Sequence, residues 1–301
     1  MLHKYISPFL ITICFALSLF LLSGCSKNQS ASDSGYIAPD SISFEEYTSL
    51  LFQSEVTSDT LTLHYTLSQP EVYGITDYKI ALPDYSANAR KQSALNIENI
   101  SCGLQSYDYE VLTTEQKLTY DILNDYVSSN RSQSDYTYYP EILRPSTGFP
   151  AQLPVLLSEY HFYDRKDVED YLTLLSLIPS CFDSVLDYET NKINEGLFLS
   201  DTQADTLIAD LNTFCDNSSE HYLITTFRNK VAELPGLTAE EQASYCIENE
   251  GAFREYVLPA YEALRDFLVE HKGSGSNSAG LCYFPDGSDY YAALVYDATG
   301  S

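Results

Sequence analysis

The chain has 301 residues and a formal net charge of −27 at pH 7, and 44% of its residues are hydrophobic. Its length exceeds that of a typical domain of about 100–200 residues, and its apolar fraction is large enough for a buried core. A surface so negative repels phosphate groups and favours solubility beside a membrane, which excludes nucleic acid as a partner.

The N-terminal segment resembles a bacterial lipoprotein signal. Lys4 supplies a positive charge, and residues 9–22 form an apolar run that is too short, and wrongly flanked, for a spanning helix. The motif Leu22-Ser23-Gly24-Cys25 follows, with small residues before the cysteine. We therefore expect a signal peptide over residues 1–24 and lipidation of Cys25, which anchors the chain to the extracytoplasmic face of a bacterial cell membrane. The alternative is an ordinary secretory signal.

Residues 25–42 are rich in Ser, Asp, Asn and Gly and are expected to form a flexible stalk. Beyond them, apolar residues recur mostly at helical spacing, and the alternation typical of strands is scarce. The sequence therefore predicts one all-α domain over residues 43–301, a multi-helix array with connecting loops rich in Pro and Tyr. A small β-hairpin near residues 281–284 is the one exception it suggests.

Five start signals divide this domain into helices. They are Ser43-x-x-Glu46, Thr113-x-x-Gln116, Asp164, Ser200 and Thr238-x-x-Glu241. Another helix is expected over residues 86–98.

Pro and Gly mark the expected interruptions. Residues 70–85 are predicted to be mostly loop, and the prolines of residues 135–160 exclude one regular helix there. Pro179 is expected to kink or break its helix, and Gly196 suits the position just after a helix end. Pro259 is expected to bend or start the helix that contains it.

Five cysteines follow the lipidation site, an odd number without a C-x-x-C pair. This pattern is unlike a disulfide scaffold or a thiolate zinc site. We expect scattered, buried thiols that act as small hydrophobic groups. These residues are Cys102, Cys181, Cys215, Cys246 and Cys282.

No complete catalytic constellation is visible. No two of the five His lie four residues apart, so the sequence has no His-Glu-x-x-His zinc helix, and it has no Gly-x-Ser-x-Gly motif either. His161 could contribute to a site through its loop, but a surface or hydrogen-bonded role is favoured. The acidic clusters lie at helix starts, where the helix dipole already favours them. We therefore assign no catalytic residue and no metal ligand.

Several stretches nevertheless resemble, in the same order, the bacterial family called domain of unknown function 885. The resemblance covers residues 43–301. Its motifs are Leu112 to Asp121, Gly148-Phe149-Pro150-Ala151-Gln152-Leu153-Pro154, Tyr160 to Tyr171, Gly196 to Asp201, Leu258-Pro259-Ala260-Tyr261 and Gly280 to Tyr291.

The resemblance implies a fold and a chemistry. Members of that family are longer, largely helical and similar to zinc carboxypeptidases, with a His-Glu-x-x-His helix in their second half. It therefore implies that this chain is a truncated N-terminal half. The zinc cofactor of a full-length member would find no ligands here. It also implies that Gly287, Tyr290 and Tyr291 lie near a substrate cleft.

Two functions are expected from these observations. The first is the N-terminal scaffold of a zinc-peptidase-like lipoprotein, inactive by itself, whose substrates are peptides outside the cytoplasm. The second is a non-catalytic lipoprotein that binds peptides or a partner through a surface rich in Tyr, a residue type enriched in recognition surfaces.

Overall fold

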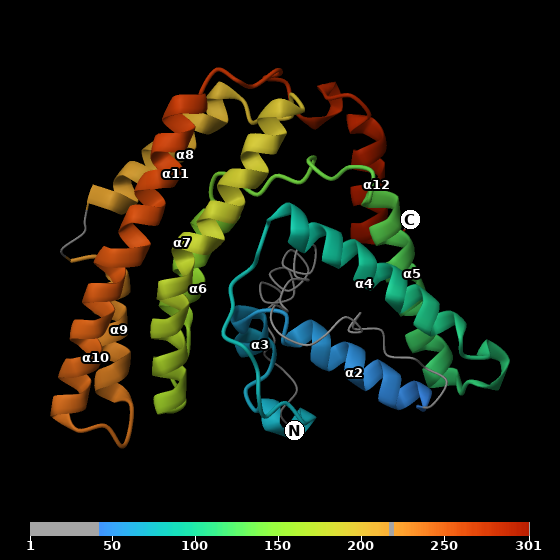
Figure 1. Ribbon diagram of the computed structural model, residues 1–301, viewed down its shortest axis with the longest axis horizontal. Helices are drawn as coiled ribbons and strands as arrows, with labels where there is room; N and C mark the ends of the chain where they lie inside the picture. The colour runs from blue at the N-terminus through green and yellow to red at the C-terminus, as the bar shows by residue number, and fades with distance from the viewer. Residues whose placement is uncertain (1–41, 217–219, 301) are drawn as a thin grey trace. The chain divides into compact units, whose positions relative to one another are not determined.

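The computed structural model describes residues 42–216 and 220–300. Helices, turns and irregular segments make up this part of the chain, and it contains no strand (Figure 1). The all-α prediction is therefore confirmed. The predicted signal peptide, Cys25 and nearly all of the predicted stalk lie outside the described residues. None of the helices in the two described ranges is long and apolar enough to cross a membrane.

The hairpin suggested near residues 281–284 is wrong. Leu281–Tyr283 form a short 3-10 helix. Its hydrogen bonds are local, because the Tyr283 N–H donates to the Gly280 carbonyl at 3.1 Å. A helix that the sequence reasoning did not anticipate follows directly, α12 (Gly287–Thr299).

The chain divides into two compact units, the first ending at Val127 and the second beginning at Ser128. The division falls inside α5 (Thr114–Gln133), within the range where one domain was expected. The other elements of the first unit are α2 (Phe44–Val56), α3 (Thr60–Thr66), α4 (Ala87–Gln105) and two 3-10 helices (Pro70–Tyr73 and Tyr109–Val111).

Part of the core of the first unit lies where α2 meets α4. Phe44, Tyr47 and Leu104 are buried together, and the Tyr47 hydroxyl donates to the Ile100 carbonyl at 3.2 Å. The close approach depends on Gly103, because a Cβ at that position would lie 2.1 Å from the Tyr47 hydroxyl oxygen.

Gly103→Ala is therefore expected to destabilise the protein by about 1–3 kcal/mol, the usual penalty for overpacking a core. Gly251→Ala is the matched control, since Gly251 is also helical but a Cβ added there would meet nothing within 4 Å. There alanine should raise stability by up to about 1 kcal/mol. Urea unfolding of both variants measures this, and equal stabilities would contradict the packing described.

The second unit is built around α7 (Arg165–Asn194), which packs against α10, a π-helical segment and α11 (Figure 1). Two pairs of neighbouring helices also belong to it, α8 with α11 and α9 with α10, and α6 packs against α9. The last residues of α5 and all of α12 lie in this unit as well. The bounds are α6 (Phe149–Glu159), α8 (Asp201–Asp216), α9 (Tyr222–Glu233), α10 (Ala239–Ala252), the π-helical segment (Phe253–Val257) and α11 (Leu258–His271).

The predicted helix starts are confirmed. Asp164 and Thr238 each form a reciprocal capping box, and Ser43 accepts the Glu46 N–H at 3.2 Å. The end of α7 also matches its prediction, because Gly196 has a φ of +71° and its N–H donates to the Ile193 carbonyl at 3.0 Å. These features are local, which explains why the sequence reveals them.

Prolines interrupt the helices less than expected. α7 does not break at Pro179, because the neighbouring Ile178, Cys181 and Phe182 are buried and tertiary packing outweighs the lost hydrogen bond. Residues 135–160 do not form one regular helix, as predicted, since they are irregular as far as Gly148, but α6 then contains Pro154. Pro259 lies at the start of α11, as predicted, directly after the π-helical segment.

The cysteines are less buried than expected. All five in the described residues are free thiols, and only Cys181 is buried. The prediction is wrong for Cys102 and Cys282, which are exposed, while Cys215 and Cys246 are half-buried.

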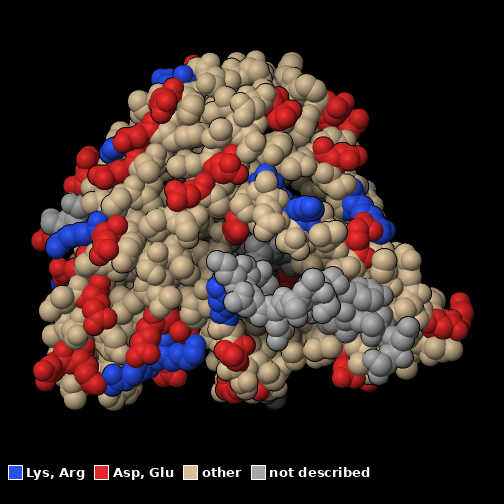
Figure 2. Space-filling model, in the orientation of Figure 1, with Lys and Arg blue, Asp and Glu red and all other residues tan. Residues whose placement is uncertain are grey.

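The surface carries many acidic side chains, because Asp and Glu together number 43 against 16 Lys and Arg. Figure 2 shows Asp and Glu spread over the visible face, with fewer Lys and Arg between them.

Candidate functional site

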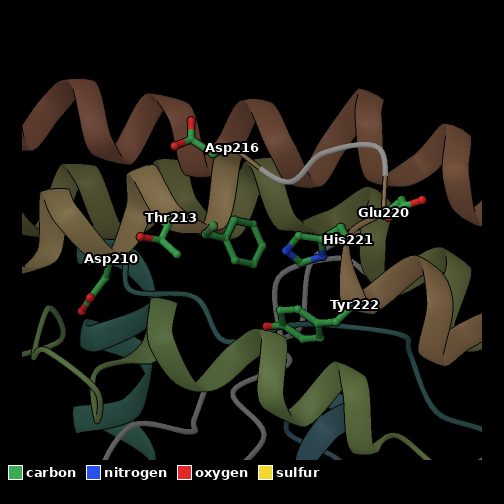
Figure 3. Close-up of a pocket in the computed structure, with 7 residues that line it drawn as sticks. Asp210, Thr213, Asp216, Glu220, His221 and Tyr222 are labelled. Carbon is green, nitrogen blue, oxygen red and sulfur yellow. The ribbon is translucent and has the colours of Figure 1, made fainter.

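A cavity of about 590 Å³ opens in the second unit where α8 ends and α9 begins (Figure 3). Three aromatic rings and three carboxylates contribute most of its lining. The lining residues are Asp210, Thr213, Phe214, Asp216, Glu220, His221 and Tyr222.

The floor of the cavity is an aromatic cluster. The His221 ring lies 4.4 Å from the centroid of Phe214 and 4.4 Å from that of Tyr222. Behind it, Phe253 of the π-helical segment stacks on His221 at 4.6 Å, and Tyr261 of α11 stacks on Phe214 at 4.0 Å. Packing against the core therefore fixes both rings in place.

His221 also begins α9. Its Nδ1 accepts the Leu223 N–H at 3.3 Å, so Nδ1 is unprotonated and we assign the proton of the neutral ring to Nε2. Burial lowers the pKa of His221 to about 4, because desolvation disfavours the imidazolium. The ring is therefore uncharged at neutral pH, and it adds no positive charge to the cavity.

The rim of the cavity is acidic. Asp210, Asp216 and Glu220 are exposed and lie around the rings in Figure 3. None of the three forms a salt bridge with a Lys or Arg of the described ranges. Thr213 adds no free donor, since its hydroxyl donates to the Ala209 carbonyl at 3.0 Å. The cavity thus combines an apolar, aromatic floor with carboxylates that form no salt bridge among the described residues.

Zinc, which the family resemblance implies for full-length members, does not fit the described residues. They contain no group of three or more His, Cys, Asp or Glu that could hold a metal ion. At the cavity, His221 is surrounded by rings, and its Nδ1 is occupied by the cap of α9. The arrangement therefore suits the binding of a ligand and supplies no zinc ligand set.

The residues predicted to lie near a substrate cleft are all on α12, and none of them lines this cavity. Gly287 is buried, and a Cβ there would lie 1.9 Å from the Leu281 carbonyl oxygen. Tyr290 packs against Tyr136 and Tyr139, with ring centroids 5.2 Å away in each case, whereas Tyr291 is 60% exposed. Their place near a cleft stays a prediction.

The surroundings of His161 and His221 differ. His161, considered from the sequence as a loop residue, is exposed and outside the cavity, and its ring lies 4.7 Å from Tyr163. His221 is 2% exposed and at the centre of the cavity floor. Sequence reasoning missed it because His is not among the preferred N-cap residues.

A second buried group was also missed, Glu189 of α7. Its side chain is fully buried, and neither carboxylate oxygen has a hydrogen-bond partner. Burial raises its pKa to about 7, an effect that Lys192 opposes and Glu141 reinforces. Lys192 Nζ itself donates to the Pro140 carbonyl at 3.2 Å. A helical pattern does not reveal such a carboxylate, because the packing of other segments decides its burial.

Comparisons with known proteins identify a family and proteins of similar fold. The sequence profile of a family described as "Bacterial protein of unknown function (DUF885)" matches residues 70–301. A search of curated proteins found no match.

A similar fold is found in a crystal structure of a protein from Colwellia psychrerythraea, described as a "putative lipoprotein". The two share 17% sequence identity with a TM-score of 0.71, and the alignment covers 86% of this chain. It covers only 45% of the Colwellia protein, so this chain spans less than half of that protein's length. At such low identity the similarity concerns the fold alone.

Proposed function

Because the chain belongs to the DUF885 family of bacterial proteins, we propose that it is the helical N-terminal part of a longer, lipid-anchored protein of the zinc-peptidase type. One observation supports the longer protein and its anchor: 86% of this chain has the same fold as 45% of a larger protein described as a lipoprotein. The zinc-peptidase type is proposed from the family resemblance of the sequence alone. The described residues offer a binding cavity and no metal-ligand set. The role proposed for this chain is therefore to bind and position peptides outside the cytoplasm.

The anchor in this proposal is Cys25. The order Leu22-Ser23-Gly24-Cys25 after an apolar run supports cleavage before the cysteine and its acylation, and two or more acyl chains hold a protein stably on a membrane. The net charge of −27 keeps the folded part away from anionic headgroups, so the acyl chains supply the attachment.

Cys25→Ala is expected to move the protein from the membrane fraction to the soluble fraction, with a fall of about tenfold or more in the membrane-bound share, because no acyl chain then remains. Cell fractionation of the expressed full chain measures this. Cys14→Ala, inside the predicted apolar run, is the matched control and should stay on the membrane. Equal membrane binding of the Cys25 variant and the natural chain would disprove the lipid anchor.

The second candidate is a lipoprotein that binds peptides or a partner without catalysis. The cavity favours it, since three aromatic rings and three carboxylates surround about 590 Å³ without a catalytic pairing of nucleophile and base. The two candidates differ in one result: the longer protein should hydrolyse peptides only if the first is correct. Purifying the native protein from membranes and assaying peptide hydrolysis separates them.

A further inference from the structure

We propose that the cavity between α8 and α9 binds an alkylammonium group, held by the accessible parts of the Phe214 and Tyr222 rings and by the surrounding carboxylates. The inference concerns this cavity alone. It does not rest on the lipid anchor or on the peptidase relationship, and it holds for this chain whether or not a longer protein exists.

The rings supply the first part of the argument. Aromatic faces attract cations through their quadrupoles, and several rings around one hollow are the usual recognition site for alkylammonium ions. Here Phe214 of α8 and Tyr222 of α9 pack on the buried His221 ring, each at 4.4 Å between centroids, and Phe214 itself is only half-buried. Tyr222 is 44% exposed, so part of its ring remains accessible to a ligand.

The charges supply the second part. Asp210, Asp216 and Glu220 give the rim three negative charges, and the neutral His221 does not offset them. Such a rim attracts cations and repels carboxylates and phosphates, so the class of ligand follows from charge complementarity. Because the carboxylates are exposed, the attraction should weaken as salt is added.

The volume of the cavity and the protonation state of Tyr222 fit the same class of ligand. A cavity of about 590 Å³ falls within the range of small-molecule sites, roughly 300–1,000 Å³. Burial also raises the pKa of Tyr222 to about 12, so its phenol stays neutral at physiological pH. The ammonium group would therefore contact uncharged rings, with the negative charge placed around the mouth.

Choline and its neutral carbon isostere, 3,3-dimethylbutan-1-ol, test the proposal directly, because they differ in charge and hardly in shape. Binding to the full chain is measured by calorimetry and by the NMR signal of the Leu223 amide, which donates to His221 Nδ1. We expect choline to bind at least about tenfold more tightly than the alcohol, to shift the Leu223 signal, and to bind more weakly at high salt.

Substitutions locate the binding. Tyr222→Leu removes a π face and should weaken choline binding about fivefold, whereas Tyr222→Phe should leave it nearly unchanged. The double substitution Asp216→Asn with Glu220→Gln should weaken it by about fivefold or more and reduce its salt dependence. Glu233→Gln, an exposed carboxylate at the far end of α9, is the matched control and should have no effect.

Two further ligands distinguish the sources of the ammonium group. Nα-acetyl-lysine methylamide carries it on a side chain, and alanine amide carries it as an amino terminus. Tighter binding of the first identifies lysine side chains as the ligand, and tighter binding of the second identifies peptide amino termini.

Three results would overturn the proposal. They are the absence of binding by every ammonium compound, equal binding of choline and the alcohol, and choline binding that the Tyr222→Leu and double variants leave unchanged. Circular dichroism of each variant shows that it is folded.

Discussion

Phe253→Ala is expected to lower the free energy of unfolding by about 3–5 kcal/mol, the usual range for removing a large buried aromatic side chain. Phe253 is 1% exposed and lies in the π-helical segment that joins α10 to α11. Its ring stacks on His221 at 4.6 Å, and its centroid is 6.4 Å from that of Phe214. The substitution therefore leaves a void directly behind the cavity floor and removes contacts from two rings that line it.

Urea unfolding followed by circular dichroism measures the loss. Phe253→Leu keeps most of the apolar volume and should be roughly half as destabilising or less. Ile247→Ala on α10 is the surface control, since Ile247 is 73% exposed and should change stability by about 0.5 kcal/mol at most. A loss below about 1 kcal/mol for Phe253→Ala would show that the ring does not support the unit as described.

Glu189→Gln is expected to remove a large part of the pH dependence of stability. The carboxyl is fully buried without hydrogen bonds, and its pKa rises from 4.5 to about 7. Between these two values the folded state holds a proton that the unfolded state releases, so stability falls as the pH rises. A shift of this size corresponds to about 3 kcal/mol, which is fully present below pH 4.5 and lost above pH 7.

Unfolding of the natural chain and the variant at pH 5 and pH 8 measures this contribution. The amide does not titrate, so the difference in stability between the two proteins should change by about 2–3 kcal/mol across this interval, with the natural chain relatively less stable at pH 8. Glu195→Gln, an exposed carboxyl at the end of the same helix, is the control. If the difference in unfolding free energy between Glu189→Gln and the natural chain is the same at pH 5 and pH 8, Glu189 is not a buried carboxyl without hydrogen-bond partners.

The features that the sequence predicts well are those that neighbouring residues decide. Thr238 and Glu241 exchange hydrogen bonds within one turn, and the Gly196 N–H donates to a carbonyl three residues earlier. Their geometry depends on backbone groups that are close in sequence, so short motifs reveal them. Helical spacing likewise revealed the all-α class.

The features that the sequence did not reveal depend on packing between distant segments. The cavity floor combines Phe214 of α8, His221 before α9, and Phe253 and Tyr261 from the run through the π-helical segment into α11. No spacing rule relates these positions. Pro179 shows the same limit, since buried neighbours hold α7 together where the local rule expected an interruption. The burial of Glu189 follows equally from contacts that no motif encodes.

The measurement that tests the central claim most directly is the reading frame of the gene beyond codon 301. The claim is that this chain is the scaffold of a longer, lipid-anchored, peptidase-like protein, and it predicts a frame that continues in register and encodes a His-Glu-x-x-His helix. A stop codon directly after Ser301 would contradict it. The chain would then act by binding alone, and the cavity between α8 and α9 would be the place to look for its ligand.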